Sequence, residues 1–230
     1  MRTISVGTVV AACALSLFAG GAALAQDQPT PVLNTLELRQ LVDRAEPADH
    51  ARLSAHFGAL AERYATDAKQ HERMAQASNG QAGKSSNPGL AAHCRSLAKF
   101  DRELEKGARS LATFHTERAA GASVAAPANT RGLESGTGAS KPTDDELAEF
   151  AANAKTSDHR ALSDYFTTLA ARYSADAASH TAMSVSYGSN SRLAGMVPHC
   201  DRLAKTARAA AKEAQMAASM HKQLLSSAAH

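Results

Sequence analysis

The residues best suited to chemistry in this chain are histidines, and they recur at matching places in two similar stretches. Reading every third or fourth residue from His50 and from His159 gives two rows that agree in residue type at every position. The rows are His50, Leu53, Phe57, Leu60, Tyr64, Asp67, His71, Met74, and His159, Leu162, Phe166, Leu169, Tyr173, Asp176, His180, Met183. This alternating spacing places each row on one face of a helix. A packed apolar face needs neither histidine nor aspartate, so these residues are the candidates for a site.

A second histidine-bearing helix is predicted after each row. It begins beside Pro88 in one repeat and Pro198 in the other, because proline fits the first turn of a helix. The histidines near the two ends of its stripe are His93, His115, His199 and His221.

The separations of the histidines predict how the two helices of a repeat pair. At a rise of about 1.5 Å per residue, His50 and His71 lie about 31 Å apart and His93 and His115 about 33 Å apart. Folding the two helices back antiparallel therefore brings His71 to His93 and His50 to His115.

Two histidine clusters follow if the repeats form an up-down-up-down four-helix bundle. The candidate metal ligands at the loop end are His71, His93, His180 and His199, with Cys94 and Cys200 beside them. A second candidate set at the opposite end is His50, His115, His159 and His221. Neutral imidazoles on facing helices suit a late first-row metal, copper or zinc. His56 and His230 fall outside this scheme.

Two aspartates are predicted to support the loop-end ligands. Asp67 and Asp176 each lie four residues before a row histidine, His71 or His180, and therefore one turn away on the same face. A carboxylate there can accept the second ring N–H and fix the tautomer of a ligating histidine. Inward-pointing Met74 and Met183 would favour copper over zinc.

The rival interpretation is a structural one. Histidine and aspartate in a helical seam can bond each other or a tyrosine hydroxyl such as that of Tyr64, and so fix the register of the helices. On this interpretation the protein is a structural or protein-interaction module of the cell envelope.

The sequence does not favour an enzyme. It has no Glu-x-x-His pair of the di-iron kind, no His-Glu-x-x-His, no Cys-x-x-Cys-His haem attachment and no phosphate-binding loop. The metal hypothesis therefore concerns buffering or carriage, with no catalytic residue assigned.

The first 25 residues read as a secretory signal peptide. Arg2 is the charged start, an apolar run follows, and Ala23 and Ala25 frame a small-x-small cleavage site. We expect export to the periplasm or beyond, with no membrane span in the mature chain.

The charge balance excludes some partners. The formal net charge is +3, and removal of Arg2 with the signal lowers it to +2, with the charges interspersed. Without a basic run or an aromatic platform, no nucleic-acid partner is expected. The expected partners are a metal ion or an envelope protein. Alternative arrangements are a homodimer formed by exchanged hairpins and two hairpins that stay apart as separate units.

The mature chain keeps two cysteines, Cys94 and Cys200, each directly after a histidine at a matching place in its repeat. In an oxidising compartment they can form a disulfide, or they can be thiol ligands. The sequence leaves both alternatives open.

The predicted architecture is all-α, with two homologous antiparallel helical hairpins, each after a short helix, paired as a four-helix bundle. Thr35 is expected to cap the first short helix, and Thr143 with Glu146 forms a capping box for the second. The long first helices are expected over 47–77 and 157–185. The predicted organisation is a signal peptide 1–25, a disordered leader 26–34, repeat 1 over 35–118, a flexible linker 119–142 and repeat 2 over 143–230.

Overall fold

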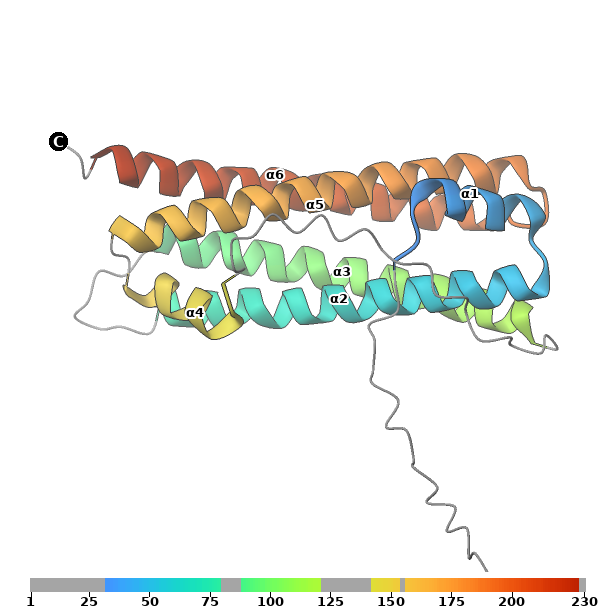
Figure 1. The fold of residues 1–230 in the computed structure, drawn as a ribbon, viewed down its shortest axis with the longest axis horizontal. Coiled ribbons are helices and arrows are strands. Elements are labelled where there is room, and N and C mark those ends of the chain that lie inside the picture. Colours follow the sequence, from blue (N-terminus) through green and yellow to red (C-terminus); the bar gives the residue numbers. More distant parts are fainter. Residues whose placement is uncertain (1–31, 80–87, 121–141, 154–155, 228–230) are drawn as a thin grey trace, which may run out of the picture.

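The computed structural model describes residues 32–79, 88–120, 142–153 and 156–227, and every regular element within these ranges is a helix (Figure 1). The elements are α1 (Thr35–Arg44), α2 (Pro47–Asn79), α3 (Pro88–Ala119), α4 (Asp144–Asn153), α5 (Thr156–Ser189), the 3₁₀ turn η1 (Ala194–Met196) and α6 (Val197–Ser227). The predicted all-α class of two hairpins, each after a short helix, is confirmed. The predicted signal peptide and nearly all of the predicted linker lie outside the described residues.

The short helices begin at side-chain caps. The side chain of Asn34, rather than the predicted Thr35, accepts the first backbone N–H groups of α1, and Glu37 reaches back to the Asn34 N–H. The last residue of the predicted leader is therefore part of the helix start. At α4 the predicted capping box is confirmed: Thr143 N–H donates to Glu146 Oε2 at 2.7 Å, and Glu146 N–H donates to Thr143 Oγ1 at 3.3 Å.

The long helices follow the prolines. After α1 the chain turns at Ala45, whose φ of 50° is left-handed, and α2 starts at Pro47. At its far end α5 continues to Ser189, four residues beyond the predicted end at position 185. Tyr187, which lies beyond the predicted end of this helix, is consequently a buried helical residue.

The two hairpins lie head to tail. Within each, α2 packs on α3 and α5 packs on α6, and the hairpins meet along α3 and α6 (Figure 1). His93, at the start of α3, bonds Glu213 in the second half of α6, while Tyr187, near the end of α5, bonds His115, near the end of α3. The two hairpin connections are therefore at opposite ends of the bundle. The predicted up-down-up-down order is wrong.

Each short helix packs more extensively on the long helix of the other repeat than on its own. Helix α1 lies against α5, and Asn190 donates to the Val42 carbonyl at 3.1 Å. Helix α4 lies against α2, where Gln70 donates to the Asp144 carbonyl at 3.1 Å and Arg73 pairs with Asp144 at 2.6 Å. The short helices thus tie the hairpins together along the side where α2 and α5 face each other.

Small residues allow α3 and α6 to approach closely. The buried face of α6 is mostly alanine. Across from it, a Cβ on Gly107 would lie 2.6 Å from Leu203 Cδ2, so a side chain at this position would require the Leu203 side chain to shift. None of the helices in the described ranges combines the length and the hydropathy that a membrane crossing requires.

Candidate functional site: the buried histidine network

A histidine pair joins the two long helices of each hairpin. The Nδ1 atoms of His50 and His115 are 2.9 Å apart, and those of His159 and His221 are 3.0 Å apart. The predicted meeting of His50 with His115 is confirmed. Burial is the main reason why the pKa of each of these imidazoles is lowered from 6.5, to about 3 for His115 and about 4 for His221. Both pairs are therefore neutral near pH 7, with one ring donating to the other.

A phenylalanine from the histidine row supports each pair. The rings of Phe57 and His115 are nearly parallel, with centroids 5.8 Å apart. Phe166 and His221 repeat this arrangement at 6.0 Å. The matched phenylalanines of the two rows are thus explained by packing against the second ring of each pair.

The two pairs differ at the outer nitrogen of the second ring. His115 Nε2 lies 2.7 Å from the Tyr187 hydroxyl, which comes from the other hairpin. The position that matches Tyr187 in repeat 1 is Ser78, which is too short to play the same part and instead donates to the Met74 carbonyl at 2.8 Å. His221 Nε2 is buried without a hydrogen-bond partner. Only the His50–His115 pair therefore has an outer hydrogen bond.

His71 lies in a fully satisfied network that links three helices. Its Nδ1 is 2.7 Å from Asp101 Oδ2 on α3, and its Nε2 is 3.1 Å from the Tyr165 hydroxyl on α5. Tyr173 donates to the other Asp101 oxygen at 2.5 Å. His71 and Asp101 have no exposed side-chain area. The partner of His71 on α3 is therefore Asp101, eight residues beyond the predicted His93.

His180, the counterpart of His71, has no such partners. Both of its ring nitrogens are buried without a hydrogen bond, and burial lowers its pKa to about 4. Ala207 stands where repeat 1 has Asp101, and His56 stands where repeat 2 has Tyr165. His56 accepts from the Leu33 N–H at Nδ1, so its proton is on Nε2, which is also unpartnered.

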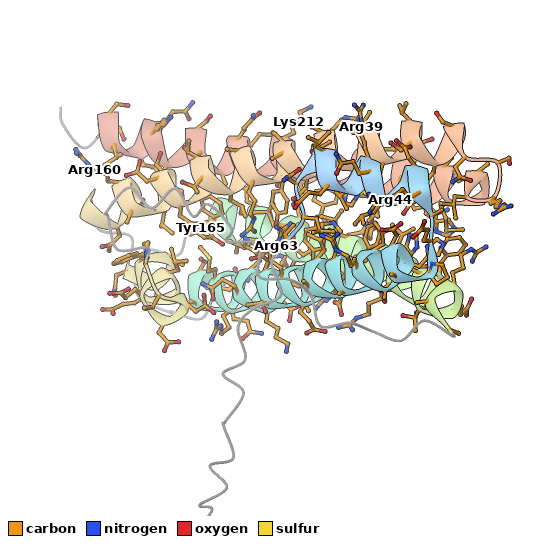
Figure 2. All side chains as sticks on the ribbon, turned by 45° about the vertical axis from the view of Figure 1, so that its right-hand side comes forward. Arg39, Arg44, Arg63, Arg160, Tyr165 and Lys212 are labelled. Atoms are coloured by element: carbon orange, nitrogen blue, oxygen red, sulfur yellow. The ribbon has the colours of Figure 1, made fainter. Side chains whose placement is uncertain are left out.

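The aspartates predicted to support His71 and His180 have other partners. Arg172 bonds Asp67, and Arg63 bonds Asp176 at 2.6 Å, so that two ion pairs cross between α2 and α5. Tyr64 also donates to Asp176. Figure 2 shows Arg63 between the helices rather than on the outer surface. The predicted outer-shell role is not found, because each carboxylate is bound by an arginine of the other repeat.

The six predicted loop-end ligands are not brought together, since the hairpins run head to tail. His93 pairs with Glu213 at 2.7 Å, and His199 is half-buried at the start of α6. Cys94 and Cys200 are buried free cysteines, so neither forms a disulfide, and burial raises the pKa of each thiol to about 12. Protonated thiols are poor ligands. Across the described ranges, no three His, Cys, Asp or Glu side chains are grouped so as to hold a metal ion.

Sequence reasoning missed most of the partners in this network. Those residues are His56, Asp101, Tyr165, Tyr187 and Glu213. Each differs in type between the repeats, and a search for matching residues passes over such positions. A search for buried polar residues at unmatched positions of the stripe would have found Asp101.

These features define a helical bundle of two head-to-tail hairpins with a histidine-rich polar interior. No family model, curated protein or solved structure matches the chain.

Proposed function

We propose that the protein is an exported helical bundle that binds copper or zinc at two separate two-histidine sites, His50 with His115 and His159 with His221. The observation that supports this proposal is the facing pair of Nδ1 atoms, which occurs in both hairpins at 2.9 and 3.0 Å. Two nitrogens at about 2.0–2.1 Å from a tetrahedral metal are about 3.3 Å apart. Each pair would have to open by only about 0.3–0.4 Å to bind a metal.

The protonation states of the paired histidines also favour metal binding. Lowered pKa values keep the imidazoles neutral, which is the form that binds metal. With Nδ1 on the metal, the proton of His115 lies on Nε2 and is donated to the Tyr187 oxygen at 2.7 Å. That hydrogen bond is the usual outer support of a ligating histidine. Two protein ligands leave the other positions open, which suits reversible uptake for buffering or carriage.

The test is a titration of the mature protein with Zn(II), Cu(II) and Cu(I), followed by competition with a chelator of known affinity. We expect two equivalents for the parent protein, one for His115→Ala, one for His221→Ala and none for the double variant. His199→Ala, a half-buried histidine outside both pairs, is the matched control and should bind two equivalents. Equal binding by the double variant and the parent would rule the proposal out.

A second candidate is the structural or protein-interaction module of the envelope. The fully satisfied arrangement of His71, Asp101 and Tyr173 supports it, because those residues are already bound to one another. On this reading the buried histidines fix how the hairpins pair. Large losses in melting temperature for metal-free His115→Ala and His221→Ala, without any metal bound by the parent, would favour it.

A further inference from the structure

A groove runs along the outer face of the second hairpin, between α5 and α6. Its main part has a volume of about 680 Å³. Its lining includes several alanines of α5 and α6 together with Thr181, Val185, Arg208 and Lys212. Arg39 comes from α1, and Figure 2 shows it beside Lys212 on the outer face.

The groove is elongated. Its main part shares Ser174 and Gln215 with a second hollow that continues to Thr167 and Lys222. From Val185 to Thr167 the path follows eighteen residues of α5, or about 27 Å at 1.5 Å per residue. A path of this length fits a helix of about five turns, whereas a single small ion would occupy only a fraction of it.

The charge of the groove has one sign. Arg39, Arg208, Lys212 and Lys222 line its two parts, and no aspartate or glutamate of the described chain does so. Arg208 donates to the Thr181 hydroxyl at 2.7 Å, and none of the ion pairs found in the described ranges involves these four cations.

On the same face of the first hairpin, two arginines are paired with carboxylates of that hairpin. There Glu72 pairs with Arg102, and Glu105 pairs with Arg109 at 2.9 Å. The positions that match these two glutamates in the second hairpin are Thr181 and Ala211. The second hairpin has a cation, Arg208, where repeat 1 has Arg102, but no carboxylate at the position that matches Glu72. Gln215 stands where repeat 1 has Arg109, so the second pair has neither of its charges in repeat 2.

We propose that this groove binds an acidic amphipathic helix of a partner protein. The partner supplies the carboxylates that repeat 1 carries itself, placed over Arg208 and Lys212. Its apolar residues contact the alanine floor and Val185, one of the few large apolar side chains that the described surface exposes, at 61%. This inference names a partner for the interaction module and does not depend on metal binding.

The probe is a fluorescein-labelled peptide of eighteen residues, with Glu spaced three and four residues apart on one face and Ala and Leu on the other. Fluorescence anisotropy with the full mature chain should show saturable binding that weakens about tenfold or more between 20 and 300 mM NaCl, since exposed charges are screened. A peptide with Lys in place of Glu should not bind.

Variants of the groove sharpen the test. The double variant Thr181→Glu/Ala211→Glu restores the carboxylates of repeat 1 and should weaken binding about tenfold or more, as should Lys212→Glu. Lys106→Glu, at the matching exposed position of repeat 1, is the control and should bind like the parent. Circular dichroism melting checks that each variant is folded.

Three results would overturn the inference: no saturable binding of the acidic peptide, equal weakening by Lys106→Glu, or binding to phosphatidylglycerol vesicles without peptide binding. A fourth such result would come from sedimentation. If the parent protein self-associates and Lys212→Glu abolishes that association, the occupant of the groove is a second copy of the chain. The metal titration is read separately, so failure here leaves the two-histidine proposal intact.

Discussion

His71 and His180 occupy matching places in the two repeats and are equally buried, yet their surroundings differ completely. His71 is bonded at both nitrogens, by Asp101 and Tyr165. His180 is bonded at neither. Two substitutions account for the difference, Ala207 for the aspartate and His56 for the tyrosine. The comparison shows that a repeated histidine need not keep its role, because its role depends on residues that are not repeated.

The largest expected effect is the response of stability to acid. Burial lowers the pKa of six histidines, which are His50, His56, His115, His159, His180 and His221. The unfolded chain therefore takes up protons near pH 6.5 while the folded chain does not. Stability should be fully present above about pH 7 and fall by several kcal/mol as the pH drops toward 4. Burial raises the pKa of Asp67, which has the opposite effect on stability, but this is one group against six histidines. Urea unfolding at a series of pH values measures this loss of stability. An unchanged or rising stability in acid would contradict the prediction.

The next effect tests the network of the first repeat. Asp101→Ala removes the carboxylate that His71 and Tyr173 share, leaving two buried polar groups without that partner. We expect a loss of about 3 kcal/mol in the free energy of unfolding. Glu103→Ala, at an exposed position two residues away, is the control and should change stability by less than about 0.5 kcal/mol. Similar losses in both variants would mean that the network contributes nothing specific.

A pair of identical substitutions compares the two repeats directly. His71→Leu leaves Asp101 and Tyr165 without their histidine and should cost about 2 kcal/mol at pH 7. His180→Leu removes a buried polar ring that has no partner, so it should be neutral or stabilising. Chemical denaturation of both variants gives the comparison. A larger loss for His180→Leu would show that the second repeat holds this ring by an interaction of its own.

The smallest effect concerns the metal sites. Tyr187→Phe removes the outer hydrogen bond of the His50–His115 pair and leaves the His159–His221 pair unchanged. If metal binds as proposed, affinity at the first site should fall about tenfold and approach that of the second. Two-site titration of the parent and the variant measures this. An equal fall at both sites would point to a general change in the bundle instead.

The sequence alone predicts the helices well because their signals are local. Apolar spacing, the Thr143–Glu146 capping box and the prolines all act within a few residues, and the structure has them as expected. The antiparallel pairing within a hairpin also follows from the sequence. The histidine spacings correctly place His50 at His115, but they wrongly place His71 at His93, because the partner of His71 on α3 is Asp101.

The relation between the hairpins was not predictable in the same way. Nothing local determines whether the two hairpin connections lie at opposite ends of the bundle or at the same end, because the segment between the repeats is long enough for either arrangement. The choice is made by contacts between positions that differ in the two repeats, such as His93 with Glu213 and Tyr187 with His115. Gly107 stands where a match to Glu213 would be, and it packs directly against the Leu203 side chain.

The exchange of α1 and α4 between the repeats has an evolutionary consequence. Two identical single-repeat chains packed in this way would form a two-fold symmetric dimer, in which every contact occurs twice. Joining the copies into one polypeptide removes that constraint, because a substitution then changes one repeat and leaves the matching position of the other repeat unchanged. Ala207, His56, Tyr187 and Glu213 are the kind of asymmetry that such a fusion permits and that a homodimer of one gene product cannot acquire.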